Sequence, residues 1–231
     1  MNYDYQSQFI GGRSAVQDRI TFVRSVYLWL MAGFGVAGLA ALGAVFTVPL
    51  WMAGFEKGGM LFGLLLVGSQ WGSIIFASRV SRRRPLNILA YGLATALLGY
   101  VAGIVSIFYA SANGAGTVMA AFGMTAADFL VLTTVAFVSK KDFSFLRNFV
   151  IVGISIMLIG SLISMFFHLP TFGLIIAAVA VIACSAKILW DTSNMLRTQD
   201  YSDPAGFALS LFVSLYNIFL SLLRLLGGRR N

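Results

Sequence analysis

The residues of this sequence that could carry chemistry are acids placed inside or beside strongly apolar segments. Asp128 stands near the middle of the apolar run 117–138. An acid at that depth is costly and usually functional, which makes Asp128 a candidate proton or cation site. The alternative is a protonated acid that bonds a neighbouring helix. Asp191 ends another run, one helical turn after Lys187. It can titrate and attract a cation, or it can be a solvated surface charge tethered to Lys187.

A polar stripe follows one face of the last apolar run. Its members recur at spacings of four, three, four and three residues, which is the repeat of one helix face: Ser210, Ser214, Asn217, Ser221 and Arg224. An amide without partners in hydrocarbon costs several kcal/mol, so the stripe should face the bundle interior or water. Two interpretations remain open, which are hydrogen bonding to neighbouring helices and an ion path.

Seven apolar runs must position these residues. The chain is 59% hydrophobic and 10% charged, and each run has about the 20 residues that a spanning helix needs. The runs are apolar on every side, whereas spanning β-strands would alternate. The sequence therefore predicts an all-α, polytopic bundle of seven helices, with residues 1–24 as a cytoplasmic arm and 25–231 as a single transmembrane domain. The spans are expected at residues 25–48, 58–77, 86–109, 117–138, 148–167, 171–190 and 204–226.

The net charge of +8 comes from Lys and Arg residues that flank these runs. A nucleic-acid site would need a basic face on a soluble domain, so a lipid bilayer, and no nucleic acid, is the expected partner. If all runs cross, nearly all basic loops fall on one side, which predicts a cytoplasmic N-terminus. Arg229 and Arg230 then fall on the other side, against this rule. His168 stands alone in a short loop, and hydrolase and nucleotide-binding motifs are missing, so no enzyme is expected.

Smaller signals concern packing and helix ends. Glycines four residues apart predict close helix contacts at Gly59/Gly63, Gly68/Gly72 and Gly99/Gly103. Asp203 before Pro204 predicts the start of the last helix, and Cys184 is expected to be buried. In the second run Ser69, Gln70 and Ser73 could join an interior polar network.

Three segments together resemble the Bax inhibitor-1 (transmembrane Bax inhibitor motif) family, and its bacterial branch above all. They are KKDFSFL at 140–146, ILWDT at 188–192 and SLFVSLYNIFL at 210–220. The resemblance implies a bundle in which six helices surround the seventh, located in a bacterial inner membrane. It also implies a pH-sensitive calcium leak, with Ca²⁺ as permeating ion and no resident cofactor. Bacterial members further resemble modulators of a membrane-anchored ATP-dependent protease.

The resemblance also implies roles for particular residues. In the leak, two aspartates share a proton, and an arginine near the end of the second helix acts as a latch. Asp191 matches the first aspartate and would be the metal ligand, while the second position falls on Ser214. Half of the acidic pair is thus missing, and with it the like-charge coupling that would raise one pKa. The latch maps to residues 79–84, where by spacing it falls on Ser81 or Arg82; Arg82 and Arg83 are the candidate arginines.

Three functions follow from these observations. The leading hypothesis is a slow cation leak or proton sensor, lined by Ser210, Asn217, Ser221 and Asp128 and closed near Asp191. The second is a membrane partner that restrains a protease through its spans and N-terminal arm. The third is an intramembrane enzyme in which Asp128 and Asp191 share a proton.

Overall fold

The structure, a computed structural model, describes residues 3–139, 141–167 and 169–228, and within them it is helical without any strand. The helices are α1 (Tyr3–Ala44), the short 3₁₀ helix η1 (Val45–Thr47), α2 (Val48–Val80), α3 (Leu86–Asn113), α4 (Ala115–Ser139), α5 (Leu146–Phe166), α6 (Pro170–Arg197) and α7 (Pro204–Gly227). Seven segments of this described part are long and apolar enough to cross a bilayer. The all-α, seven-helix prediction is confirmed. His168, Arg229 and Arg230 lie outside the described residues.

All four prolines of the chain lie at helix starts. Pro49, Pro170 and Pro204 occupy the first turns of α2, α6 and α7, and Pro85 immediately precedes α3. Proline suits a first turn because the amide hydrogen that it lacks would have no partner there. At α7 the side chain of Asp203 accepts a hydrogen bond from the amide of Gly206, at 2.8 Å. The predicted start of the last helix is therefore confirmed.

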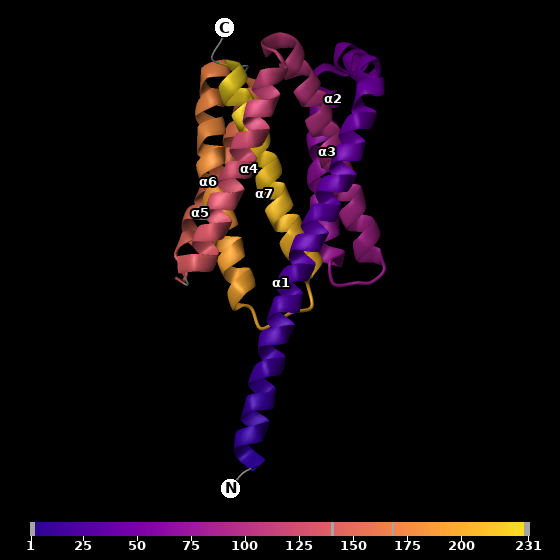
Figure 1. Cartoon of the computed structure of the whole chain (residues 1–231). Helices are drawn as coiled ribbons and strands as arrows, with labels where there is room; N and C mark the ends of the chain where they lie inside the picture. Colours follow the sequence, from indigo (N-terminus) through magenta and orange to yellow (C-terminus); the bar gives the residue numbers. More distant parts are fainter. Residues whose placement is uncertain (1–2, 140, 168, 229–231) are drawn as a thin grey trace.

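The first helix differs from the sequence prediction at both ends. Residues 3–24 continue into the first span as one helix, and in Figure 1 this part of α1 projects beyond the bundle. No proline occurs before Pro49, so nothing interrupts the helix earlier. Residues 49–57, expected as a loop, are helical as well. The break falls at Gly59, whose φ of 48° is one that glycine adopts without strain.

Successive helices run in opposite directions, so the chain ends at the opposite end of the bundle from its beginning (Figure 1). This arrangement is that of seven crossings. α7 packs against α1, α3, α4 and α6, and more lightly against α2. Buried faces of α1, α3, α6 and α7 share one apolar core, which includes Leu30, Leu98, Ile188 and Leu215.

Of the predicted glycine contacts, the structure forms the pair in α3. A Cβ on Gly99 would lie 2.3 Å from the Cα of Ala37, and one on Gly103 would lie 2.7 Å from the Cα of Ala41. These glycines let α1 and α3 approach closely. The prediction of a close helix contact at Gly68 and Gly72 is wrong, because a Cβ at either position would meet no atom within 4 Å. Gly59 forms no such contact and is instead the residue at which α2 breaks.

Candidate functional site: a buried ion pair beside the seventh helix

Asp191 lies in the last two turns of α6 and is 7% exposed. Lys187, one helical turn earlier, pairs with its Oδ2 atom at 2.5 Å. The hydroxyl of Ser210 in α7 donates to the same oxygen at 2.7 Å, and the Lys187 ammonium also donates to that hydroxyl. A carboxylate, an ammonium and a hydroxyl thus form a closed triangle between two helices. Asp191 is a buried, paired group, and the alternative of a solvated surface charge is excluded.

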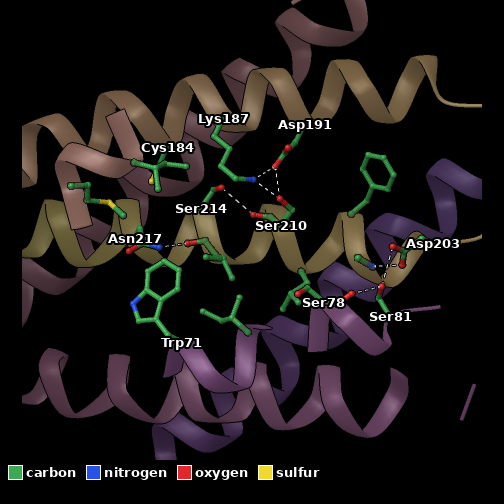
Figure 2. A pocket seen from close by; sticks show the side chains of 17 residues that line it. Trp71, Ser78, Ser81, Cys184, Lys187, Asp191, Asp203, Ser210, Ser214 and Asn217 are labelled. Atoms are coloured by element: carbon green, nitrogen blue, oxygen red, sulfur yellow. Dashed lines mark hydrogen bonds and ion pairs between the residues drawn. The ribbon is translucent and has the colours of Figure 1, made fainter. Parts of the chain in front are cut away.

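The triangle borders a cavity of about 440 Å³. α2 contributes Trp71, Ser78 and Ser81 to its lining, α6 contributes Cys184, and α7 contributes Ser214 and Asn217. Figure 2 shows Asp203 and Ser81 toward one end, Asn217 and Trp71 toward the other, and the triangle between them. The cavity places the ion pair beside a space that runs along α7.

The predicted stripe of α7 points inward. Ser214 is 1% exposed and donates to the carbonyl of Ser210 at 3.0 Å. The amide of Asn217 lines the cavity and donates to the carbonyl of Val213 at 2.8 Å. Ser221 is buried as well. The sequence argument that these groups face the interior is confirmed, whereas their role as an ion path stays a prediction.

One residue of the second run forms a hydrogen bond with α7. Gln70 of α2 accepts a hydrogen bond from the hydroxyl of Tyr216 in α7 at 3.0 Å. Ser69 and Ser73 donate to carbonyls within α2. Gln70 therefore fixes α2 to α7 at a point where the two helices have few other contacts.

The structure places the two latch candidates away from the triangle. Arg82 is exposed, and its guanidinium lies 2.9 Å from an oxygen of Asp200 and 3.8 Å from one of Asp203. Ser81 also donates to Asp203, at 3.0 Å. Arg83 is exposed. Arg82 thus joins the turn after α2 to the loop before α7, and the cation at Asp191 is a lysine from its own helix.

Two carboxyls in the loops have lowered pKa values. Hydrogen bonds from the hydroxyl and amide of Ser202, together with the Arg82 guanidinium, hold the pKa of Asp200 below its ordinary value. Hydrogen bonds from Ser144, with a smaller contribution from Arg197, do the same for the pKa of Asp142. Both acids are therefore ionised at neutral pH, and each sits opposite an arginine.

Asp128 lies elsewhere, on α4, where it is partly buried. The hydroxyl of Ser185 in α6 donates to its Oδ2 atom at 2.9 Å. Asp128 and Asp191 therefore have different hydrogen-bond partners. Cys184 is buried, as predicted. In the part of the chain that the structure describes, no three His, Cys, Asp or Glu side chains gather as metal ligands.

These features define the class of protein: a multi-pass, all-helical membrane protein with a polar site buried against its last helix. Comparison with known sequences gives the family. The sequence model described as "Inhibitor of apoptosis-promoting Bax1" matches residues 19–231. The chain belongs to this family, which is the one its sequence segments resemble.

Relatives with this sequence pattern occur in bacteria and in a virus. The chain is 34% identical to the modulator of FtsH protease YccA of Escherichia coli K12, over 71% of this chain and 75% of the relative. It is 28% identical to an uncharacterized protein of Campylobacter jejuni, over 97% and 95% of the two chains. It is also 30% identical to a Golgi anti-apoptotic protein of vaccinia virus, over 92% and 87%.

The sequence argument missed two contacts. It assigned no role to Ser185, which carries no motif that links it to Asp128. It also did not identify Ser210, in place of Ser214, as the hydroxyl at Asp191. The spacing of α7 put both serines on one face, and only the relative height of α6 and α7 decides which of them meets the carboxylate.

Proposed function

We propose that this protein passes cations slowly across the membrane along the polar face of α7, with Ca²⁺ as the permeating ion. The observation that carries the proposal is the buried carboxylate of Asp191, which borders the cavity and has an intramolecular cation bound. Carboxylate oxygens are the ligands that Ca²⁺ prefers, and an acid at this depth in a membrane protein is usually functional.

Lys187 makes the resting site neutral. Its ammonium occupies the Asp191 oxygen that an entering cation would use, so a permeating ion must displace it. This competition supports a slow leak over an open channel. Protonation of Asp191 would leave the positive charge of Lys187 alone beside the cavity, and that charge repels cations. The proposed flux therefore falls as the pH on the accessible side becomes acidic.

The experiment is Ca²⁺ flux into liposomes that contain the purified protein, with three variants. Asp191→Asn should abolish the flux and its pH dependence. Lys187→Met should raise the flux, because the competing cation is gone. Lys57→Met removes the same charge from an exposed position and should behave as the wild-type protein does. Equal flux in the wild-type and Asp191→Asn proteins at every pH would overturn the proposal.

We propose transport in preference to catalysis because the two membrane acids do not share a partner. Asp128 accepts from Ser185, while Asp191 is held by Lys187 and Ser210. A proton shared between two carboxylates requires that they face each other.

A second candidate function is modulation of a membrane-anchored ATP-dependent protease. It is supported by the relative in Escherichia coli, whose name describes it as a modulator of the FtsH protease. The projecting part of α1 gives such a partner a surface outside the bundle (Figure 1). By the charge rule this arm is cytoplasmic. The proposed membrane is the inner membrane, because a second Escherichia coli relative, of strain O6:H1, is named inner membrane protein YccA.

Crosslinking in native bacterial membranes tests this second function. The full-length chain should capture the protease, and a chain that lacks residues 2–15 should capture less while its Ca²⁺ flux is unchanged. Equal capture by both chains would exclude the arm as the contact surface. The absence of any capture would exclude the partnership.

A further inference from the structure

A second cavity lies at the end of the bundle opposite the projecting arm. Its volume is about 770 Å³, and it lies between the last turns of α3, the first turn of α6 and the last turns of α7. The lining includes Tyr109 and Asn113 of α3, Thr171 of α6 and Arg224 of α7. None of these residues borders the cavity beside Asp191, so this is a separate site.

Arg224 brings a guanidinium to this cavity. It donates a hydrogen bond to the hydroxyl of Ser164, at 3.2 Å, and none of the carboxylates among residues 3–228 that the structure describes forms an ion pair with it. A guanidinium has five N–H donors in a planar fork, and this geometry matches two oxygens of a phosphate or carboxylate. A cation held in a membrane protein normally has an anionic counterpart.

Two glycines shape the space around this guanidinium. A Cβ on Gly173 would lie 1.8 Å from an Nη atom of Arg224, and a Cβ on Gly227 would lie 2.4 Å from the ring of Tyr109. Any larger residue at position 173 would displace the guanidinium. The position of Arg224 therefore depends on a small residue in α6, far away in the sequence.

The depth of Arg224 points to the kind of anion. It lies three residues before the end of α7, which is roughly 5 Å along a helix that rises 1.5 Å per residue. Arg224 therefore lies within about one turn of the end of a membrane-spanning segment, where the headgroup region begins. The rim is apolar, with Leu174 and with Phe108, which is 41% exposed. A cationic interior next to an apolar rim fits a phospholipid, whose phosphate and acyl chains meet at the same boundary.

We propose that this cavity binds the phosphate group of an anionic phospholipid, with the Arg224 guanidinium as its principal donor. Tyr109, Asn113 and Thr171 supply polar groups around the headgroup. The site is independent of the proposed cation leak, and its test measures no ion flux.

The test is native mass spectrometry of the full-length protein titrated with phosphatidylglycerol, with phosphatidylcholine and inorganic phosphate as separate arms. The wild-type protein should bind phosphatidylglycerol with a dissociation constant at least about tenfold lower than that of Arg224→Met, because charged bidentate contacts are the strong ones. Arg224→Lys should give an intermediate value, since lysine keeps the charge and loses the fork. Phosphatidylcholine should bind more weakly than phosphatidylglycerol.

Two further variants keep the result interpretable. Gly173→Ala retains every charge, displaces the flexible end of Arg224 together with the nearby hydroxyl of Ser164, and should weaken phosphatidylglycerol binding as Arg224→Met does. Lys57→Met removes a charge from the same end of the bundle, outside the cavity, and should leave binding unchanged. Unchanged binding in Arg224→Met or Gly173→Ala would overturn the proposal, as would an equal loss in Lys57→Met. If millimolar inorganic phosphate displaced phosphatidylglycerol, the site would be one for free phosphate, and the proposal of a phospholipid ligand would be wrong.

Discussion

The burial of the ion pair between Lys187 and Asp191 predicts how the free energy of unfolding changes when one or both of its charges are removed. Their side chains are only 18% and 9% exposed, so neither charge is well solvated. Removal of one member of such a pair leaves the other charge buried, which typically costs about 3–5 kcal/mol, while replacement of both is often neutral. We expect Lys187→Met to lower the free energy of unfolding by about 3 kcal/mol, the lower end, because the lysine keeps some contact with solvent.

The double variant Lys187→Met/Asp191→Asn should recover most of this loss. It removes both charges, and the asparagine amide can still bond the hydroxyl of Ser210, so we expect a net cost of about 1 kcal/mol.

Reversible unfolding in mixed detergent micelles, followed by tryptophan fluorescence, measures these free energies of unfolding. Lys57→Met is the matched control, since it removes an exposed ammonium and should change the free energy of unfolding by less than about 0.5 kcal/mol. The reasoning is refuted if Lys187→Met is as stable as the wild-type protein, or if the double variant loses the sum of the two single losses.

Three further predictions concern the rest of the structure. Gly99→Val should lower the melting temperature by several degrees because its Cβ would meet the backbone of α1, whereas Gly68→Val, which meets open space, should leave it nearly unchanged. Asp203→Ala should cost about 1 kcal/mol through the lost helix cap, and Asp200→Ala, at an exposed position, should cost much less. The Asp200 carboxyl should titrate below its ordinary value in an NMR pH series, and its hydrogen bonds from Ser202 persist until the pH falls through that lowered pKa.

Hydrophobic length and periodicity were sufficient to predict the helices and the inward face of α7. A polar group in hydrocarbon is so costly that Ser214 and Asn217 had to turn toward the bundle. The spacing of four residues on α6 allows Lys187 to pair with Asp191, but it does not exclude Arg82 as a competing cation. The spacing of α7 also does not specify which serine meets Asp191: the relative height of α6 and α7 selects Ser210, and this height depends on packing along whole helices.

The glycine pairs also show that sequence spacing alone does not specify which helices are in contact. Spacing identified Gly99 and Gly68 as equally good contact positions, since each has a second glycine four residues later. Only the α3 pair meets a neighbouring backbone, because α1 lies against α3 along its length while α2 has much looser contacts with its neighbours. A small residue permits close approach but does not attract a helix.

The presence of Lys187 accounts physically for a serine at position 214. A buried carboxylate needs a cation, or a proton shared with a second acid, to remain stable away from water. Here the cation is built into α6, one turn from Asp191, and the pair is neutral. A second aspartate at position 214 would add an uncompensated negative charge, whereas Ser214 satisfies its own hydroxyl on the α7 backbone. The site therefore holds a single carboxylate in a neutral ion pair, and it needs no second acid at position 214.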